Sequence, residues 1–320
     1  MASNSYPRPG FNDGEVIEAL YERLVAPQAP DGLIGAPTDQ PLVYADGVGT
    51  RAVRIRAGRF ALVRGFQFDS GDADITITLP ANTSGASRVD LIVLRLDRST
   101  WRVQETFIQG TAGQGAPSPV ASPLFWDLPV AAVTVAHNAG TLSPTTVQPR
   151  AWYIGDDGQL RCTSTTRPPH QSGRRIWEHD TNQEMQSTGS RWIVTAANVT
   201  EVRIDSTLNN FTITTESIVQ QRGVGPGGSV KLRFGSFIRS GGSSLPSSGD
   251  IRLPATVPAA ARHPDRDQRC SVYLPGGRSG QVTIFSAGAG TKAGQIWLTS
   301  HPGLSVGDTI LGTNVGWDIP

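Results

Sequence analysis

The glycine-rich stretch Gly223–Gly228 (GVGPGG) has the spacing GxGxxG, which binds a pyrophosphate when it joins a strand to a helix. The nucleotide site depends on that helix, because its N-terminal N–H groups hold the phosphates. Here the following residues, Val230–Phe234, alternate as a strand does, and Pro226 interrupts the loop. The stretch therefore predicts a hairpin turn and no nucleotide cofactor.

A metal site has one candidate segment, His263–Asp267 (HPDRD), which offers nitrogen and oxygen ligands. Three arginines, Arg262, Arg266 and Arg269, surround it, and their charge opposes a bound cation. No CxxC pair or Cys/His cluster is present. We therefore predict a solvated loop here, with neither a metal nor any other cofactor.

The two cysteines, Cys162 and Cys270, are far apart in the sequence. Neither a disulfide framework nor a zinc site uses a single distant pair, so we predict two independent thiols.

Catalytic constellations are not recognisable in the sequence. The GxSxG elbow is absent, and the segment Gly277–Gly280 (GRSG) lacks its spacing. A Ser/His/Asp triad of distant residues, or a pair among the 27 acidic residues, stays an open alternative. The prediction is a protein without enzymatic activity and without catalytic residues.

Aromatic side chains in the C-terminal part are the candidates for sugar contacts, because aromatic rings stack on the apolar faces of sugars. The candidates for receptor binding are Tyr273, Trp297 and Trp317. Each is equally suited to a core or a subunit interface, where buried aromatic residues dominate.

Composition argues against several classes of partner. The net charge is +1, and no long run carries one sign, so we expect no nucleic-acid binding. Residues Met1–Pro7 lack the pattern of a signal peptide, and the longest apolar run, Leu128–Ala136, is too short to span a bilayer. We expect a protein that is made in the cytoplasm without an export signal and does not insert into membranes.

A short helix is predicted near the N-terminus. Asn12 is a good N-cap, Glu15 completes a capping box, and Pro27 ends the helix. Apolar residues recur at helical spacing at Val16, Ile17, Leu20, Tyr21 and Leu24. A helix of this length is marginal alone, so its apolar face is expected to dock on its own domain or on a neighbouring subunit.

Beyond this helix the chain alternates with a period of two, and its 36 glycines and 23 prolines indicate many turns. The predicted strands are Ala52–Arg56, Ala73–Leu79, Arg88–Asp97, Trp101–Gln109, Leu128–Ala136, Glu201–Ile204, Phe211–Thr215, Ser229–Phe237, Gln281–Ser286 and Gln295–Thr299. The fold class is therefore all-β, with an N-terminal arm and short helix (1–39), a β-sandwich (40–154), a polar connector with small hairpins (155–191) and a C-terminal β-sandwich (192–320).

Two stretches resemble bacteriophage proteins. Ser87–Asp97 (SRVDLIVLRLD), Gln104–Gly110 (QETFIQG), a proline-rich loop and Leu128–Val135 (LPVAAVTV) are similar to tail-tip and baseplate proteins, especially those of actinobacterial siphophages. Gly173–Thr181 (GRRIWEHDT) is similar to a short element, GxxIYETDTxxxxxWDGSxW, of phage tail and fibre proteins. It departs from that pattern at Trp177 and His179, and the first Trp is missing.

The resemblance implies a virion protein of the phage tail tip, a minor tail or baseplate subunit that forms a homo-oligomer, expected to be a homotrimer. The arm and first sandwich would attach to other tail or baseplate proteins. The C-terminal domain would adsorb to host cell-surface polysaccharide. Two alternatives stay open: a tail-associated enzyme that degrades polysaccharide, and a purely structural tail component.

Overall fold

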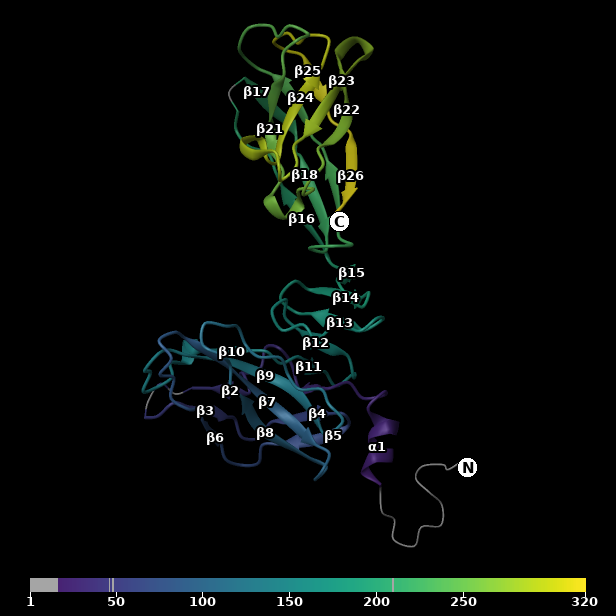
Figure 1. Ribbon diagram of the computed structural model, residues 1–320. Coiled ribbons are helices and arrows are strands. Elements are labelled where there is room, and N and C mark those ends of the chain that lie inside the picture. Colours follow the sequence, from purple (N-terminus) through teal and green to yellow (C-terminus); the bar gives the residue numbers. More distant parts are fainter. Residues whose placement is uncertain (1–16, 46, 48, 209) are drawn as a thin grey trace. The chain divides into compact units, whose positions relative to one another are not determined.

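The computed structural model describes residues 17–45, 47, 49–208 and 210–320. The chain forms two compact units (Figure 1). The N-terminal unit runs to Pro169 and includes Arg175–Asp180, and the C-terminal unit contains His170–Arg174 and Thr181–Pro320. Within the described residues there is one α-helix, and strands make up nearly all other regular structure. The prediction of an all-β fold is confirmed.

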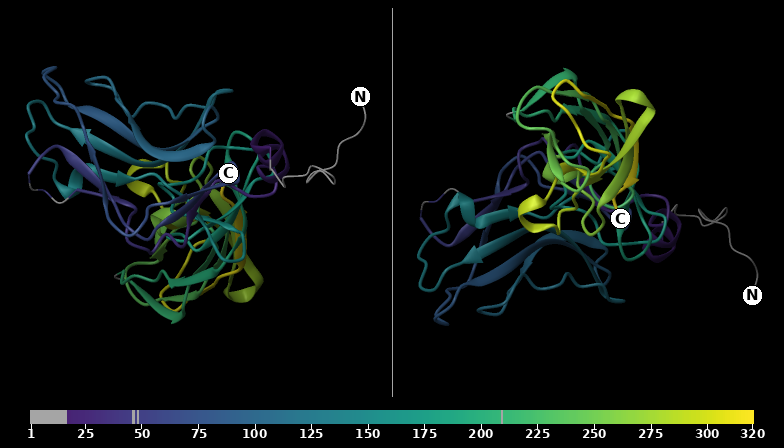
Figure 2. Two further views of the ribbon diagram at one scale, coloured as in Figure 1. Left: turned by 90° about the horizontal axis from the view of Figure 1, so that it is seen from below. Right: turned by 90° about the horizontal axis from the view of Figure 1, so that it is seen from above.

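The N-terminal unit is built from short strands and one long pair (Figures 1 and 2). Its elements are α1 (Glu18–Val25), β1 (Gly32–Ile34), β2 (Val43–Tyr44), β3 (Ala52–Ile55), β4 (Phe60–Val63), β5 (Phe66–Asp69), β6 (Ile75–Thr78), β7 (Arg88–Asp97), β8 (Arg102–Ile108), β9 (Phe125–Val135), β10 (Val147–Pro149), β11 (Tyr153–Ile154), β12 (Leu160–Cys162) and β13 (Arg175–Glu178). They form the sheets β10-β9-β7-β8 and β2-β3-β6, and a third with the order β13-β12-β11-β1-β4-β5.

Strand β7 is the centre of this unit. Its segment Leu91–Leu94 is apolar on both faces and almost completely buried, because neighbouring strands flank it and other elements cover both faces. β7 pairs antiparallel with β9 along ten registered positions, Arg88 to Asp97. The predicted strand Arg88–Asp97 and its hairpin partner are therefore both present.

Helix α1 buries an acidic residue, while part of its apolar stripe stays exposed. The predicted capping residues Asn12 and Glu15 lie outside the described residues. Ile17 and Leu24 are 45% and 43% exposed, whereas the acidic Glu22 is buried. Glu22 is held by two arginines of the unit, Arg64 and Arg98. Part of the apolar stripe docks within the unit through Tyr21, whose hydroxyl donates to the carbonyl oxygen of Gly65. An ion-paired carboxylate takes the most buried position on the helix, and docking of the exposed Ile17 and Leu24 on a neighbouring subunit stays a prediction.

The C-terminal unit consists of the antiparallel strand pair β14 and β15 and a sandwich of two further sheets. Its strands are β14 (Gln183–Ser187), β15 (Trp192–Ala197), β16 (Val199–Arg203), β17 (Phe211–Thr215), β18 (Ile218–Arg222), β19 (Ser229–Arg233), β20 (Ser236–Arg239), β21 (Ile251–Thr256), β22 (Gln268–Leu274), β23 (Arg278–Ile284), β24 (Gln295–Ser300), β25 (Thr309–Leu311) and β26 (Asn314–Asp318). One sheet has the order β16-β18-β19-β26 and the other β17-β20-β25-β22-β23-β24-β21. Alternate residues of both sheets, such as Leu232 and Phe237, meet in one apolar core.

One predicted strand of this unit is wrong in its extent. Ser229–Phe237 was expected as a single strand, but β19 ends at Arg233 and β20 begins at Ser236, in the opposite sheet. The chain crosses between the sheets at Gly235, where an added Cβ would lie 2.1 Å from the carbonyl oxygen of Thr215. Only glycine allows so close a backbone approach.

The glycine-rich stretch after β18 is a hairpin loop, as predicted. Arg222 and Ser229 are registered partners in the antiparallel pair β18 and β19, and the loop 223–228 joins them. Gly223, Gly225 and Gly227 adopt positive φ angles, which glycine reaches without steric cost. A strand, and not a helix, follows the loop, so it has no helix N-terminus with which to bind a pyrophosphate.

The stretch 155–191 contains more buried positions than a polar connector was expected to have. β12 and β13 belong to the N-terminal unit, and β14 belongs to the C-terminal unit. Cys162, Ile176 and Met185 are at most 1% exposed. Short strands with alternate buried residues therefore continue through this part of the chain.

Candidate functional site

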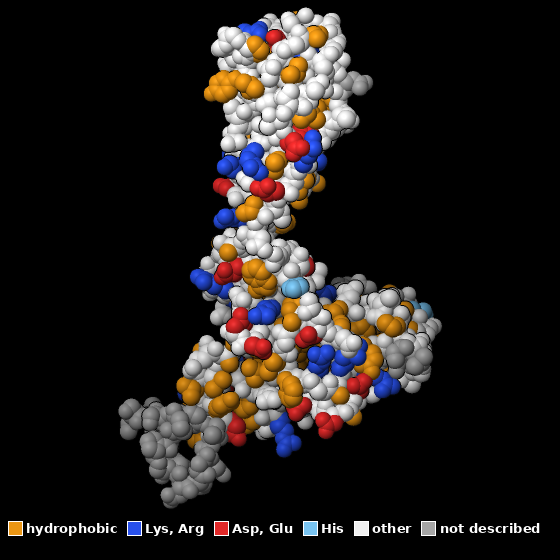
Figure 3. Space-filling view, turned by 180° about the vertical axis from the view of Figure 1, so that it is seen from behind, with side chains coloured by type: hydrophobic (Ala, Val, Ile, Leu, Met, Phe, Trp, Pro, Cys, Tyr) orange, Lys and Arg blue, Asp and Glu red, His pale blue; other side chains and the backbone are white. Residues whose placement is uncertain are grey.

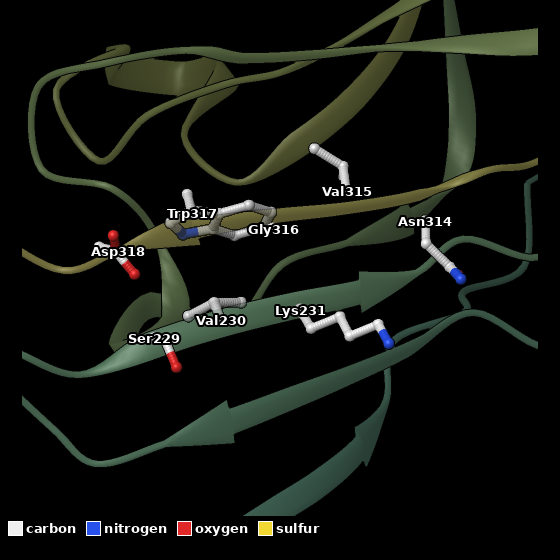
Figure 4. A pocket seen from close by; sticks show the side chains of 8 residues that line it. All are labelled: Ser229, Val230, Lys231, Asn314, Val315, Gly316, Trp317 and Asp318. Carbon is white, nitrogen blue, oxygen red and sulfur yellow. The ribbon is translucent and has the colours of Figure 1, made fainter.

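An open groove of about 410 Å³ lies on the C-terminal unit along β19 and β26 (Figure 4). This volume falls within the range typical of small-ligand sites, about 300–1,000 Å³. The residues that line it are Ser229, Val230, Lys231, Asn314, Val315, Gly316, Trp317 and Asp318.

The pairing of the two strands places the polar side chains of the groove on one face. Ser229 is registered with Asp318, and Lys231 is registered with Gly316. Because side chains alternate along a strand, these residues face outward while Val230 and Trp317 face the core. Figure 4 shows Val315 on the opposite side from the Lys231 side chain. Gly316 carries no side chain, which leaves the space beside Lys231 open.

The polar groups of the groove are available to a ligand. Within the described part of the chain, the side chains of Ser229, Lys231, Asn314 and Asp318 make no hydrogen bond or ion pair. Together they offer an ammonium group, an amide, a hydroxyl and a carboxylate, so donors and acceptors lie side by side. A polyol such as a sugar needs this mixture, since each of its hydroxyls donates and accepts.

The neighbouring strands hold the surrounding charges in place. On the same outward face, Glu201 Oε1 lies 3.1 Å from Arg233 Nη2 and also accepts a hydrogen bond from the Gln220 amide. Gln220 is the registered partner of Lys231 on the other side from Gly316. The adjacent acidic residue is therefore engaged by Arg233 and Gln220, and the Lys231 ammonium faces the groove uncompensated.

Of the three predicted receptor residues, Trp317 lines this groove, but as its floor. Its side chain is 8% exposed, and the indole N–H donates to the carbonyl oxygen of Ala261 at 3.0 Å. Trp317 therefore positions β26 against the core and has little ring surface with which to stack on a sugar.

Trp297 and Tyr273 lie on the other sheet. Trp297 on β24 is half-buried, and the Lys292 ammonium lies 4.4 Å from its ring centroid. Tyr273 on β22 is 60% exposed. Their registered partners on β23, Thr283 and Ser279, are separated by about 13 Å along the strand at roughly 3.3 Å per residue. The structure thus does not bring the three aromatic residues together.

The polar residues of the groove were missed because each one resembles an ordinary exposed strand residue. Lys231 is far from Asn314 and Asp318 in the sequence, and only the pairing of β19 with β26 brings the three residues together. Two signals were present: Lys231 is one of only two lysines, and Gly316 interrupts a strand. A glycine inside a strand often marks a place where a ligand or another backbone approaches.

The other sequence candidates form no evident site. His263 Nδ1 accepts hydrogen bonds from the N–H groups of Asp265 and Arg266, which stabilises a loop. Among the described residues, no group of three His, Cys, Asp or Glu side chains is arranged to hold a metal ion. Cys162 and Cys270 are free thiols in different units. No helix in the described ranges is long and apolar enough to cross a membrane.

Comparisons with known proteins provide no further basis for assigning a function. No protein-family model, no curated protein and no solved structure matches the chain.

Proposed function

We propose that this chain is a structural subunit of a phage tail tip or baseplate, and that its C-terminal unit adsorbs to a host cell-surface polysaccharide. The observation that carries the adsorption is the groove along β19 and β26, with four polar side chains that have no partner in the described structure. The resemblance of the Arg88–Val135 region to tail-tip proteins supports the virion assignment. The N-terminal unit would then attach to other tail proteins.

The composition of the groove favours binding over cleavage. Asp318 is the only carboxylate among its lining residues, whereas both common mechanisms of glycoside hydrolysis use two carboxyl groups. An open surface groove binds a single sugar weakly. Assembly as a homotrimer would strengthen adsorption by avidity, by roughly 10²–10⁴-fold.

The test is binding of the purified chain to host cell-wall polysaccharide, compared with Lys231→Ala. We expect this variant to bind about tenfold more weakly, because a hydrogen bond to a charged group is worth about 1.5–3 kcal/mol. Arg269→Ala is the matched control, since it removes an exposed cation from the other sheet. Equal loss in both variants would place the binding surface elsewhere.

Two further readouts separate the alternatives. Release of reducing ends from the polysaccharide would establish a degrading enzyme, and absence of both binding and cleavage would favour a purely structural component. A light-scattering mass equal to a single chain at micromolar concentration would contradict the trimer.

A further inference from the structure

Arg239, at the end of β20, is a buried cation without a counter-charge. Its side chain is 3% exposed, and in the described part of the chain it forms no ion pair. Nη2 donates to the carbonyl oxygen of Ser243, but Nε and Nη1 have no hydrogen-bond partner. A guanidinium is always charged, and burying a charge without compensation is costly. The Arg239 guanidinium therefore lacks an anionic partner within the described part of the unit.

The groups next to Arg239 do not supply that charge. The backbone carbonyl oxygen of Asp308 accepts a hydrogen bond from the Arg239 N–H, but the Asp308 carboxylate is bound by other residues. Asp308 Oδ2 lies 3.3 Å from Arg278 Nη2 and accepts from the Ser305 N–H at 2.9 Å. The Phe211 ring centroid lies 6.0 Å from the guanidinium carbon, which gives at most a weak cation–π contact.

The loop that covers Arg239 has unused donors of its own. Gly242 has a φ of +80°, and a Cβ added there would lie 3.1 Å from Arg239 Nη2, so the loop backbone lies directly against the guanidinium. Gly242, Ser243 and Ser244 are exposed. In the described structure, the backbone N–H groups of residues 241–244 and the hydroxyls of Ser243 and Ser244 donate no hydrogen bond.

The loop beside Arg239 is short and polar, because it consists of Gly241, Gly242, Ser243 and Ser244. In the face of the C-terminal unit that Figure 3 shows, backbone and uncharged polar side chains (white) predominate at the top of the view, among a few charged and hydrophobic side chains. A charged group under so short a glycine and serine loop becomes accessible through a local movement of a few residues, which exposed loops undergo readily.

We propose that Arg239 and the loop Gly241–Ser244 form an oxyanion site that takes the carboxylate or phosphate group of an acidic sugar. Such an oxyanion supplies both the missing charge and the acceptors for Nε and Nη1. The sugar as its source rests on the proposed adsorption to polysaccharide, whereas the oxyanion site itself rests on Arg239 alone. It lies on a different sheet from the groove and would select acidic over neutral polysaccharides.

The first test uses the full chain and simple anions. Thermal unfolding is followed while glucuronate or inorganic phosphate replaces chloride at constant ionic strength, with glucose as the neutral comparison. The melting temperature is expected to rise with glucuronate, with phosphate or with both, and not with glucose. The anion that gives the larger rise identifies the source. No rise with either anion would overturn the site and indicate that water alone solvates Arg239.

Variants locate the effect. Arg239→Met should abolish the rise in melting temperature or weaken binding of the anion about tenfold or more. The Met side chain has a similar length but lacks the charged hydrogen-bond donors of the guanidinium. Arg266→Met, which removes an exposed cation of the same unit, should keep the rise in full. An equal rise in wild type and Arg239→Met would overturn the proposal. If Arg239→Met does not fold, Arg239→Lys decides, since undiminished anion affinity in that variant would equally contradict a guanidinium site.

A second comparison separates this proposal from the proposed function. Wild type and Arg239→Met are tested on an acidic polysaccharide and on the same polymer after its carboxyl groups are reduced to alcohols. Preference for the acidic polymer in the wild type alone supports the site. Binding of both polymers by both proteins would retain the proposed function and overturn the site. A free-anion effect at Arg239 with no polysaccharide binding would retain the oxyanion site and overturn the proposed function.

Discussion

At the scale of single residues, Arg88 and Asp90 of β7 form a buried ion pair in the N-terminal unit. Arg88 Nε lies 2.8 Å from Asp90 Oδ1, with the side chains 5% and 0% exposed. Asp90 also accepts from the Gly110 N–H, and Arg88 donates to the carbonyl oxygens of Pro80 and Ala81. The pair therefore ties the long central strand to the loops at its end.

We expect Asp90→Ala to lower the free energy of unfolding of the N-terminal unit by about 3–5 kcal/mol, because Arg88 would stay buried without its partner. Urea denaturation measures this difference. The control is Asp97→Ala at the other end of β7, where the carboxylate caps a turn through Ser99 and its removal should cost about 1 kcal/mol or less. Comparable losses in the two variants would contradict this account of the pair.

At the level of elements, the carboxylate of Glu22 anchors helix α1 to the N-terminal unit, alongside the Tyr21 hydroxyl, which donates to the carbonyl oxygen of Gly65. Glu22 accepts hydrogen bonds from Arg98 and Arg64 at 2.7 and 2.8 Å. The hydrogen bond from Arg98, with that from Arg64, holds the pKa of the Glu22 carboxyl below its ordinary value of 4.5, although burial acts to raise it. A carboxyl with a lowered pKa stabilises the folded state above the unfolded-state value and loses that contribution as the pH falls through the folded-state value.

Replacement of Glu22 by Gln should therefore remove a pH-dependent contribution to stability. The wild type is expected to be more stable than Glu22→Gln at pH 6–7, and the difference should shrink once the pH falls below about 4.5. Urea denaturation of both proteins from pH 7 to pH 3 checks this. A difference that stays constant over this range would show that the carboxylate charge does not hold the helix.

These elements also show what the sequence could and could not predict. Strands Arg88–Asp97 and Phe211–Thr215 were predicted at their observed bounds, because β-branched residues, alternation and turn residues are local signals. The burial of Glu22 was not predictable, since it depends on Arg64 and Arg98, which are distant in the sequence. The change of sheet at Gly235 escaped detection because the apolar pattern continues across it.

The candidate sites depend even more on tertiary pairing. The aromatic residues that the sequence suggested lie apart, whereas the groove arises where β19 meets β26, two strands distant in sequence. An exposed and a buried arginine look alike in a sequence. The missing counter-charge of Arg239 is therefore visible only when its surroundings are known.

At the scale of the whole molecule, the two compact units each have their own buried residues, so each has its own source of cooperativity. We expect calorimetry of the full chain to show two unfolding transitions. Asp90→Ala should lower the melting temperature of one, and the anion that binds at Arg239 should raise that of the other, because each perturbation acts inside a single unit. A single transition that responds to both would show that the units unfold together, and the stability of one would then govern the other.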